Sequence, residues 1–256
     1  WKQFLKRWTN SEVDVFSAME TEDLNTLKEI YENYYVFGVS EGASSGKALI
    51  NNGYEYKRNK SQRNIKRAKL LSEHLNLKTT NVNEIYNILN KKLTIPESPN
   101  YGQTWGWWYE NTFIHFELAD YIYFFDFISK ILKEKNINKT CFIGEGSGLL
   151  STLVYNNCDI TSSTHIDLSH FLLKQYLNNT NNSNIKYHYA ENFDSNTIHN
   201  SEILINQDSF PEMLDLSVDR YIKNASLNKV KYILSYNKET LYEGGNPHSD
   251  FKSIIK

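Results

Sequence analysis

The chain has 256 residues, and 28 Lys and Arg against 30 Asp and Glu give a formal net charge of −2. A near-neutral chain lacks the overall positive charge that attracts nucleic acid, so we expect no nucleic-acid partner. No apolar run approaches the roughly 18 residues of a membrane-spanning helix, and the two cysteines lack metal-site or redox spacing. We therefore expect a soluble cytoplasmic protein without an integral membrane segment.

The first part of the chain predicts helices. Apolar residues recur at helical spacing over 21–35, 61–75 and 82–89. Two prolines, Pro96 and Pro99, end this pattern. The stretch 100–110 contains Gly and is expected to form a loop, and the apolar run over 112–133 predicts a buried helix. The predicted organisation is a helical N-terminal region over 1–110, followed by a second domain over 111–256.

The second domain predicts a parallel sheet. Short strand-like runs at 140–143, 160–166, 185–189, 202–205 and 230–235 alternate with helical patterns at 149–155, 169–177 and 213–224. Strands that alternate with helices favour a mainly parallel sheet with helices on its faces. The predicted fold class is therefore α/β, with a Rossmann-like sheet.

A glycine cluster follows the first of these strands. Gly144, Gly146 and Gly148 allow the sharp strand-to-helix turn that brings backbone close to a ligand. Asp167 ends the next strand, where a carboxylate can accept hydrogen bonds from both hydroxyls of a ribose. An N-cap for the following helix is the structural alternative for Asp167.

Two nucleotide-type ligands compete for this glycine turn. A dinucleotide fold needs Gly-x-Gly-x-x-Gly and a helix N-terminus that faces a pyrophosphate. The spacing here is Gly-x-Gly-x-Gly, and the turn carries Glu145. A carboxylate repels phosphate but suits a cationic methionine group, so spacing and charge favour S-adenosylmethionine.

From residue 142 to residue 239 the sequence resembles the bacterial sugar O-methyltransferases of polysaccharide and antibiotic-glycoside pathways. The shared stretches are FIGEGSGLL at 142–150, IDL at 166–168, NQDSFPEM at 206–213 and LSYNKE at 234–239. The resemblance implies a class I methyltransferase sheet, S-adenosylmethionine as cofactor and S-adenosylhomocysteine as product. It also implies a small-molecule or nucleotide-linked sugar as the acceptor.

The sequence departs from this family in two places. Phe142 stands where the family usually has an acidic residue, two positions before the first glycine. The chain also ends soon after Glu239. We therefore expect either a shortened sheet at its C-terminal strands or a truncated chain.

The resemblance assigns residues to the methyl donor. The four positions Gly144, Glu145, Gly146 and Gly148 would line its methionine end. Asp167 would hold the ribose, with Leu168 beside the adenine and Asn192 at the adenine edge. Asn206 and Gln207 would lie at the mouth where donor and acceptor meet.

The catalytic candidates are acidic residues and one histidine. A sugar hydroxyl is a poor nucleophile, so a general base should assist it. Asp208 is the first candidate, with a helix N-cap as its structural alternative, and His248 is a second. Glu212 and Glu239 would orient the acceptor hydroxyls. They could instead join Asp208 around a divalent cation, although no spacing in the sequence establishes a metal site.

The acceptor is expected to meet aromatic residues. Flat apolar rings with polar handles suit carbohydrate, although core packing is the alternative. The predicted acceptor residues are Trp105, Trp107, Trp108, Tyr109 and Asn237. Two other functions stay open: methylation of another small or phosphate-linked acceptor, with the basic run 58–69 on the phosphate, and a non-catalytic module with the donor fold. The sequence leaves the oligomeric state open.

Overall fold

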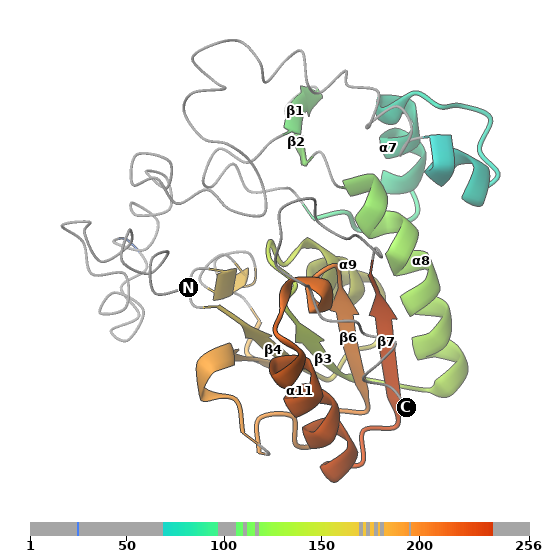
Figure 1. Ribbon diagram of the computed structural model, residues 1–256. Helices are drawn as coiled ribbons and strands as arrows, with labels where there is room; N and C mark the ends of the chain where they lie inside the picture. The colour runs from blue at the N-terminus through green and yellow to red at the C-terminus, as the bar shows by residue number, and fades with distance from the viewer. Residues whose placement is uncertain are drawn as a thin grey trace. The chain divides into compact units, whose positions relative to one another are not determined.

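The structure, a computed structural model, describes residues 69–96, 106–109, 112–115, 118–168, 182–194 and 196–237 (Figure 1). It also describes Asn25, Phe171, Leu172, Gln175, Tyr176 and Asn179. Contacts divide the chain into two compact units, Trp1–Phe125 and Asp126–Lys256, which are described separately below. The division falls inside helix α8 (Leu118–Lys135). The predicted domain boundary after residue 110 stays a prediction.

The first unit contains helix α7 (Val82–Asn90), as the 82–89 pattern predicts. Asn81 caps this helix, because its Oδ1 accepts hydrogen bonds from the backbone N–H groups of Asn83 at 2.9 Å and Glu84 at 3.4 Å. Such caps satisfy N–H groups that lack a partner in the first turn. Residues 69–74 are also helical, within the predicted 61–75 helix.

Two predictions for the first unit are wrong. Strand β1 (Gly106–Tyr109) replaces part of the predicted 100–110 loop, and strand β2 (Thr112–His115) replaces the start of the predicted 112–133 helix. The two strands pair antiparallel, with Trp107 opposite Ile114. Aromatic and β-branched residues fit a pleated surface. An apolar run as short as 112–115 therefore matches a strand as well as a helix, and strand pairing decides the outcome.

The second unit is built on a five-stranded sheet, and the predicted α/β fold is confirmed. The strands are β3 (Lys139–Ile143), β4 (Ser162–Asp167), β5 (Ile185–Tyr189), β6 (Ile203–Gln207) and β7 (Tyr232–Tyr236). Their order is β5-β4-β3-β6-β7, and every neighbouring pair is parallel. The order reverses between β3 and β6. In open parallel sheets a ligand crevice forms outside the carboxyl ends of the strands at such a reversal.

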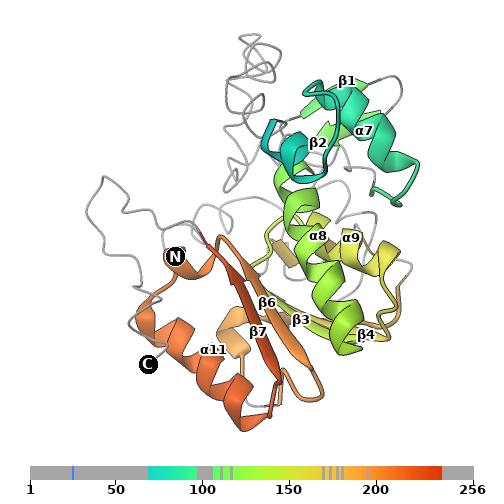
Figure 2. The ribbon, with the colours of Figure 1, turned by 90° about the vertical axis from the view of Figure 1, so that its right-hand side faces the viewer.

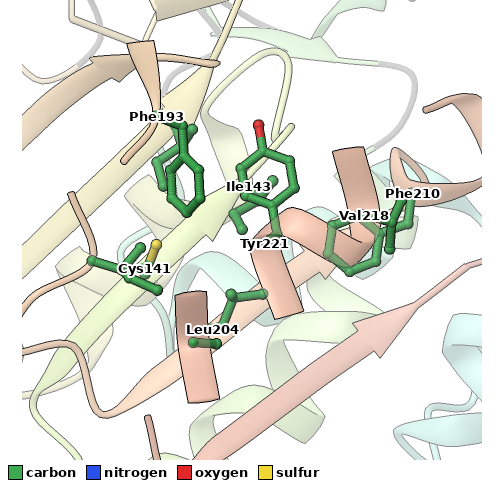
Figure 3. Close-up of a cluster of buried hydrophobic side chains, with 10 residues drawn as sticks. Cys141, Ile143, Phe193, Leu204, Phe210, Val218 and Tyr221 are labelled. Carbon is green, nitrogen blue, oxygen red and sulfur yellow. The ribbon is translucent and has the colours of Figure 1, made fainter. Parts of the chain in front are cut away.

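Helices cover both faces of this sheet. Helix α9 (Leu149–Asn157) follows β3 and lies on one face, and α11 (Asp215–Leu227) lies on the other (Figure 2). On the α11 face, Phe193, Phe210, Val218 and Tyr221 pack with the inward residues of β3 and β6 (Figure 3). Burial of one such apolar side chain contributes roughly 1.5–3 kcal/mol, so this core fixes the sheet on which the site is built. None of the helices in the described parts of the chain is long and apolar enough to span a membrane.

Candidate functional site

The glycine turn joins β3 to α9 at the carboxyl edge of the sheet. Gly144, Gly146 and Gly148 have φ values of +64°, +66° and +77°. A residue with a Cβ pays roughly 1–2 kcal/mol in this left-handed region, which is why glycine stands at all three positions. The N–H of Gly144 donates to the carbonyl of Ile166 at 2.9 Å, so the turn is tied to β4.

Gly144 also makes room for the end of β6. A Cβ at this position would lie 2.1 Å from Ser209 Oγ, closer than real atoms approach. Ser209 Oγ donates to the carbonyl of Ile143 at 3.2 Å, and the buried Asn206 donates from Nδ2 to the same carbonyl at 2.9 Å. Asn206 Nδ2 also contacts Ser209 Oγ. These contacts hold the carboxyl ends of β3 and β6 together at the reversal point.

Asp167 clamps the glycine turn from β4. Its Oδ2 accepts hydrogen bonds from Gly146 N–H and Gln175 Nε2, both at 2.9 Å, and its Oδ1 accepts from Leu168 N–H at 2.8 Å. Burial raises the pKa of Asp167 to about 6, although these hydrogen bonds oppose the rise. The N–H of Glu145 also hydrogen-bonds to this carboxylate and opposes the rise, so backbone N–H groups of the glycine turn converge on Asp167. The ribose contact of Asp167 and the adenine contact of Leu168 stay predictions.

Glu145 turns inward from the glycine turn. Its Oε1 accepts a hydrogen bond from Ser151 N–H in the first turn of α9, and its Oε2 has no hydrogen-bond partner. Oε2 lies 3.7 Å from Nδ1 of the buried His165. Burial raises the pKa of Glu145 to about 8 and lowers that of His165 to about 4, so both are mainly uncharged at neutral pH. The predicted contact of Glu145 with the donor stays a prediction, and the carboxyl group occupies the N-terminus of α9.

The ends of β6 and β7 carry two buried acceptors without partners. These atoms are Gln207 Oε1 and Asn237 Oδ1. The Nδ2 of Asn237 contacts Ser235 Oγ, and Gln207 stands opposite Tyr236 in the pairing of the two strands. A buried acceptor without a partner costs roughly 1–3 kcal/mol, so such atoms in a native fold call for an explanation such as a missing ligand.

Asp208 occupies an unusual backbone conformation at the end of β6. Its φ is +56°, and its N–H donates to the carbonyl of Tyr236 at 2.9 Å. The left-handed region is unfavourable for a non-glycine residue, and residues held in it cluster at functional sites. The hydrogen bond to β7 holds Asp208 half-buried beside the turn that begins with Ser209.

The remaining predicted residues are placed as follows. Asn192 is exposed in the short helix η2 (Ala190–Asn192) after β5. Glu212 lies in η3 (Phe210–Glu212), and Trp107, Trp108 and Tyr109 lie in β1, with only their backbone described. Three of the predicted site residues, Trp105, Glu239 and His248, fall outside the described residues. Within the described ranges, no group of three His, Cys, Asp or Glu side chains is arranged to hold a metal ion.

The sequence did not identify three residues that lie around the turn: Ser209, Gln175 and His165. Ser209 stands inside the NQDSFPEM stretch, so the motif contained it without revealing its contact with the turn. Gln175 and His165 belong to no motif, although His165 precedes Asp167 by two positions on the same strand. The ring of Phe142 packs 5.4 Å, centroid to centroid, from that of His165. An aromatic contact therefore occupies position 142, two positions before the first glycine of the turn.

Comparison with known proteins gives partial likenesses only. No family model and no curated protein matches the sequence. The methyltransferase domain of bacterial CtHen1 is 14% identical over 50% of this chain and 74% of its own, with a TM-score of 0.40. A S-adenosylmethionine-dependent methyltransferase from Clostridium acetobutylicum is 18% identical over 43% of this chain and 46% of its own, with a TM-score of 0.36.

A third similar structure is CalS10 from Micromonospora echinaspora, an amino pentose methyltransferase of calicheamicin biosynthesis with S-adenosylmethionine bound. It is 10% identical over 47% of this chain and 54% of its own, with a TM-score of 0.37. The chain thus spans about half of the Clostridium and Micromonospora structures. The fold assignment rests on the strand order and the glycine turn rather than on these likenesses.

Proposed function

We propose that this protein is a S-adenosylmethionine-dependent methyltransferase that transfers a methyl group to a sugar hydroxyl. The observation that carries the proposal is the glycine turn at the strand-order reversal, clamped by Asp167 from the neighbouring strand. A nucleoside ligand fits this place, because a parallel sheet of this order binds ligands outside its carboxyl ends.

Open space at the glycine turn and an unpaired acceptor on β6 support a donor site here. A Cβ built at Gly146 would meet no atom within 4 Å, so the turn leaves open space on that side. The end of β6 carries a buried acceptor, Gln207 Oε1, that lacks a partner. An adenosyl sulfonium with an amino group and ribose hydroxyls brings the hydrogen-bond donors that such acceptors need.

The position of Glu145 argues against a dinucleotide. A pyrophosphate binds a Rossmann-type turn through free N–H groups at the N-terminus of the following helix. Here the Ser151 N–H in the first turn of α9 already donates to Glu145 Oε1. A second acidic group placed there would compete with this carboxyl group for the same helix end. This contact favours a ligand without phosphate.

The acceptor is the finer part of the proposal. It is supported by the resemblance of the 206–213 and 234–239 stretches to sugar O-methyltransferases and by the Trp-rich strand β1. A sugar presents several hydroxyl donors, which suits the unpaired amide oxygen of Asn237 after β7. The left-handed conformation of Asp208 is consistent with a group held for function at this edge.

The chain's own residues would assist the transfer by position and by proton removal. S-adenosylmethionine, when bound, supplies a methyl group on a sulfonium. Asp208 accepts the hydroxyl proton as the acceptor oxygen forms its bond to the methyl carbon and the carbon–sulfur bond breaks. Asn237 orients the acceptor through its remaining hydroxyls, and orientation of this kind supplies much of the rate in a bimolecular transfer.

A methyl-transfer assay tests the proposal. Donor with a labelled methyl group is incubated with a panel of nucleotide sugars, free sugars and a phenol, and labelled products are measured. We expect label on a sugar, and a kcat roughly 10²–10⁴-fold lower in Asp208→Asn at unchanged donor affinity. The matched control is Asp215→Asn, at an exposed acid in the first turn of α11. No labelled product with any acceptor would overturn the activity, and a labelled phenol alone would overturn the sugar.

A further inference from the structure

Behind the glycine turn lies a buried polar chain that no step of the proposed reaction uses. Its members are Thr140, Ser163, His165, Gln175 and Asp167, all buried within the second unit. Thr140 Oγ1 donates to Ser163 Oγ at 2.9 Å, and Ser163 Oγ lies 3.1 Å from His165 Nε2. The opposite ring nitrogen, Nδ1, lies 3.1 Å from Gln175 Oε1. This polar chain thus runs from β3 along β4 to the carboxyl group that clamps the turn.

The acceptors at the Asp167 end of this polar chain fix which group donates in each of its hydrogen bonds. The Nε2 of Gln175 lies 2.9 Å from Asp167 Oδ2 and 3.2 Å from the carbonyl of Gly146. Both atoms accept hydrogen bonds, so the amide must present its NH₂ group to them and its oxygen to His165. His165 Nδ1 must then carry the ring proton, and Nε2 accepts from Ser163. The lowered pKa of His165 agrees with a neutral ring.

Gln175 itself is held from two sides. Its main-chain carbonyl accepts hydrogen bonds from Asn179 Nδ2 at 2.9 Å and from the hydroxyl of Tyr187 at 3.4 Å. Its side chain lies over the glycine turn, where a Cβ at Gly148 would come within 2.9 Å of Gln175 Cγ. Gly148 is therefore needed for this approach as well as for its own left-handed backbone.

We propose that Gln175 is a positioning residue for the donor site, holding Asp167 and the Gly146 peptide in one orientation through a hydrogen-bond direction set by His165. The inference rests on the proposed function, because the ligand positioned is the donor nucleoside. Gly146 N–H and Gln175 Nε2 both donate to Asp167 Oδ2, so together they set the orientation of the carboxyl group that would meet the ribose. Loss of the amide would free Asp167 to rotate and release the turn.

Two substitutions separate hydrogen-bond direction from packing. Gln175→Leu keeps most of the volume and removes both polar atoms. Gln175→Glu keeps the shape, but its carboxyl group can donate to Asp167 only when protonated. At about pH 8.5 it faces Asp167 as a like charge, and at about pH 6 the pair shares a proton and restores the hydrogen bond. The other titratable groups around this place are Glu145, His165, Tyr187 and Tyr221, and Gln175→Leu at the same two pH values reports their effect without a new charge.

The experiment is calorimetric titration of S-adenosylmethionine into wild type, Gln175→Leu, Gln175→Glu and the control Val218→Ala. Val218 lies in α11 and is buried in an apolar cluster that includes no member of the polar chain, so its truncation reports general destabilisation. We expect about tenfold or weaker binding in Gln175→Leu at both pH values. In Gln175→Glu we expect a similar loss at about pH 8.5 and affinity within about threefold of wild type at about pH 6. Val218→Ala should bind as wild type does.

The outcomes divide clearly. Wild-type affinity in both Gln175 variants, or an equal loss in both at each pH, would overturn the positioning role. Absence of binding by wild type would overturn the proposed function. A second readout needs no ligand: the ¹⁵N shifts of His165 should report Nδ1-protonated imidazole in wild type and a loss of that tautomer's dominance in Gln175→Leu. An unchanged tautomer in this variant would overturn the role of the amide, even if donor binding fails.

Discussion

Alanine substitutions at Gly144 and Gly146 form a matched pair. Both positions have nearly the same φ, +64° and +66°, so the left-handed backbone destabilises each alanine variant by the same roughly 1–2 kcal/mol. Only at Gly144 does the new Cβ meet an obstacle, with Ser209 Oγ at 2.1 Å and Ser209 Cβ at 2.5 Å. At Gly146 the Cβ enters open space.

The difference between the two alanines follows from this contact. Ser209 must move away from Gly144→Ala and lose its hydrogen bond to the Ile143 carbonyl, which costs about 1 kcal/mol. Crowding at the junction of β3 and β6 adds roughly 1–3 kcal/mol. The backbone cost cancels, so Gly144→Ala should be about 2–4 kcal/mol less stable than Gly146→Ala. Donor affinity should show the opposite order among folded variants, because the Gly146 methyl group projects into the proposed donor space.

Urea unfolding followed by circular dichroism measures the two stabilities. Ser209→Ala in the Gly144→Ala background provides a control, since it removes the nearest obstructing atom and should recover part of the loss. Equal unfolding free energies for the two alanines, within about 0.5 kcal/mol, would refute the reasoning. So would a failure of Ser209→Ala to reduce the difference, because the penalty would then not arise from this contact.

Three further predictions concern charge and the acceptor. Glu145 has a folded pKa of about 8 against an ordinary 4.5, so its contribution to stability is lost as the pH rises through that range. The free energy of unfolding of the wild type should therefore fall by up to about 2 kcal/mol between about pH 6.5 and about pH 8, and Glu145→Gln should abolish this fall. Urea unfolding at each pH measures it. The same pH dependence in Glu145→Gln and wild type would contradict the burial of this carboxyl group. Donor affinity should fall as Asp167 becomes protonated below about pH 6, and Asp167→Asn should weaken donor binding about tenfold or more with little pH dependence. Calorimetric titration at several pH values checks both expectations. Undiminished affinity of the wild type at about pH 5 would contradict them. Trp107→Ala together with Trp108→Ala should raise the KM for the acceptor and leave donor affinity unchanged, whereas loss of donor binding or of folding would contradict an acceptor role.

The sequence predicted the sheet well, because parallel strands buried on both faces appear as short apolar runs between helical patterns. The glycine turn was recognisable for a related reason, since a strand-to-helix turn at φ above zero restricts the residue type. The hairpin β1–β2 was missed, because 112–115 is too short for its periodicity to separate strand from helix. Strand pairing there is a tertiary property that the local pattern does not contain.

The contacts of the site depended on more than residue identity. Glu145 was identified as a member of the turn, but its inward direction depends on an N–H of α9 and on the burial of Oε2 beside His165. Ser209 meets Gly144 only because β6 lies next to β3. Gln175 reaches Asp167 because its side chain passes close over Gly148, and no residue spacing in the sequence predicts this contact.

Calorimetric titration of the full chain with S-adenosylmethionine, S-adenosylhomocysteine and NAD tests the central claim most directly. The glycine turn, the clamp by Asp167 and the occupied N-terminus of α9 predict saturable one-to-one binding of the first two and none of NAD. Gly146→Ala should weaken the S-adenosylmethionine binding. Absence of heat with S-adenosylmethionine, or tighter binding of NAD, would contradict the account.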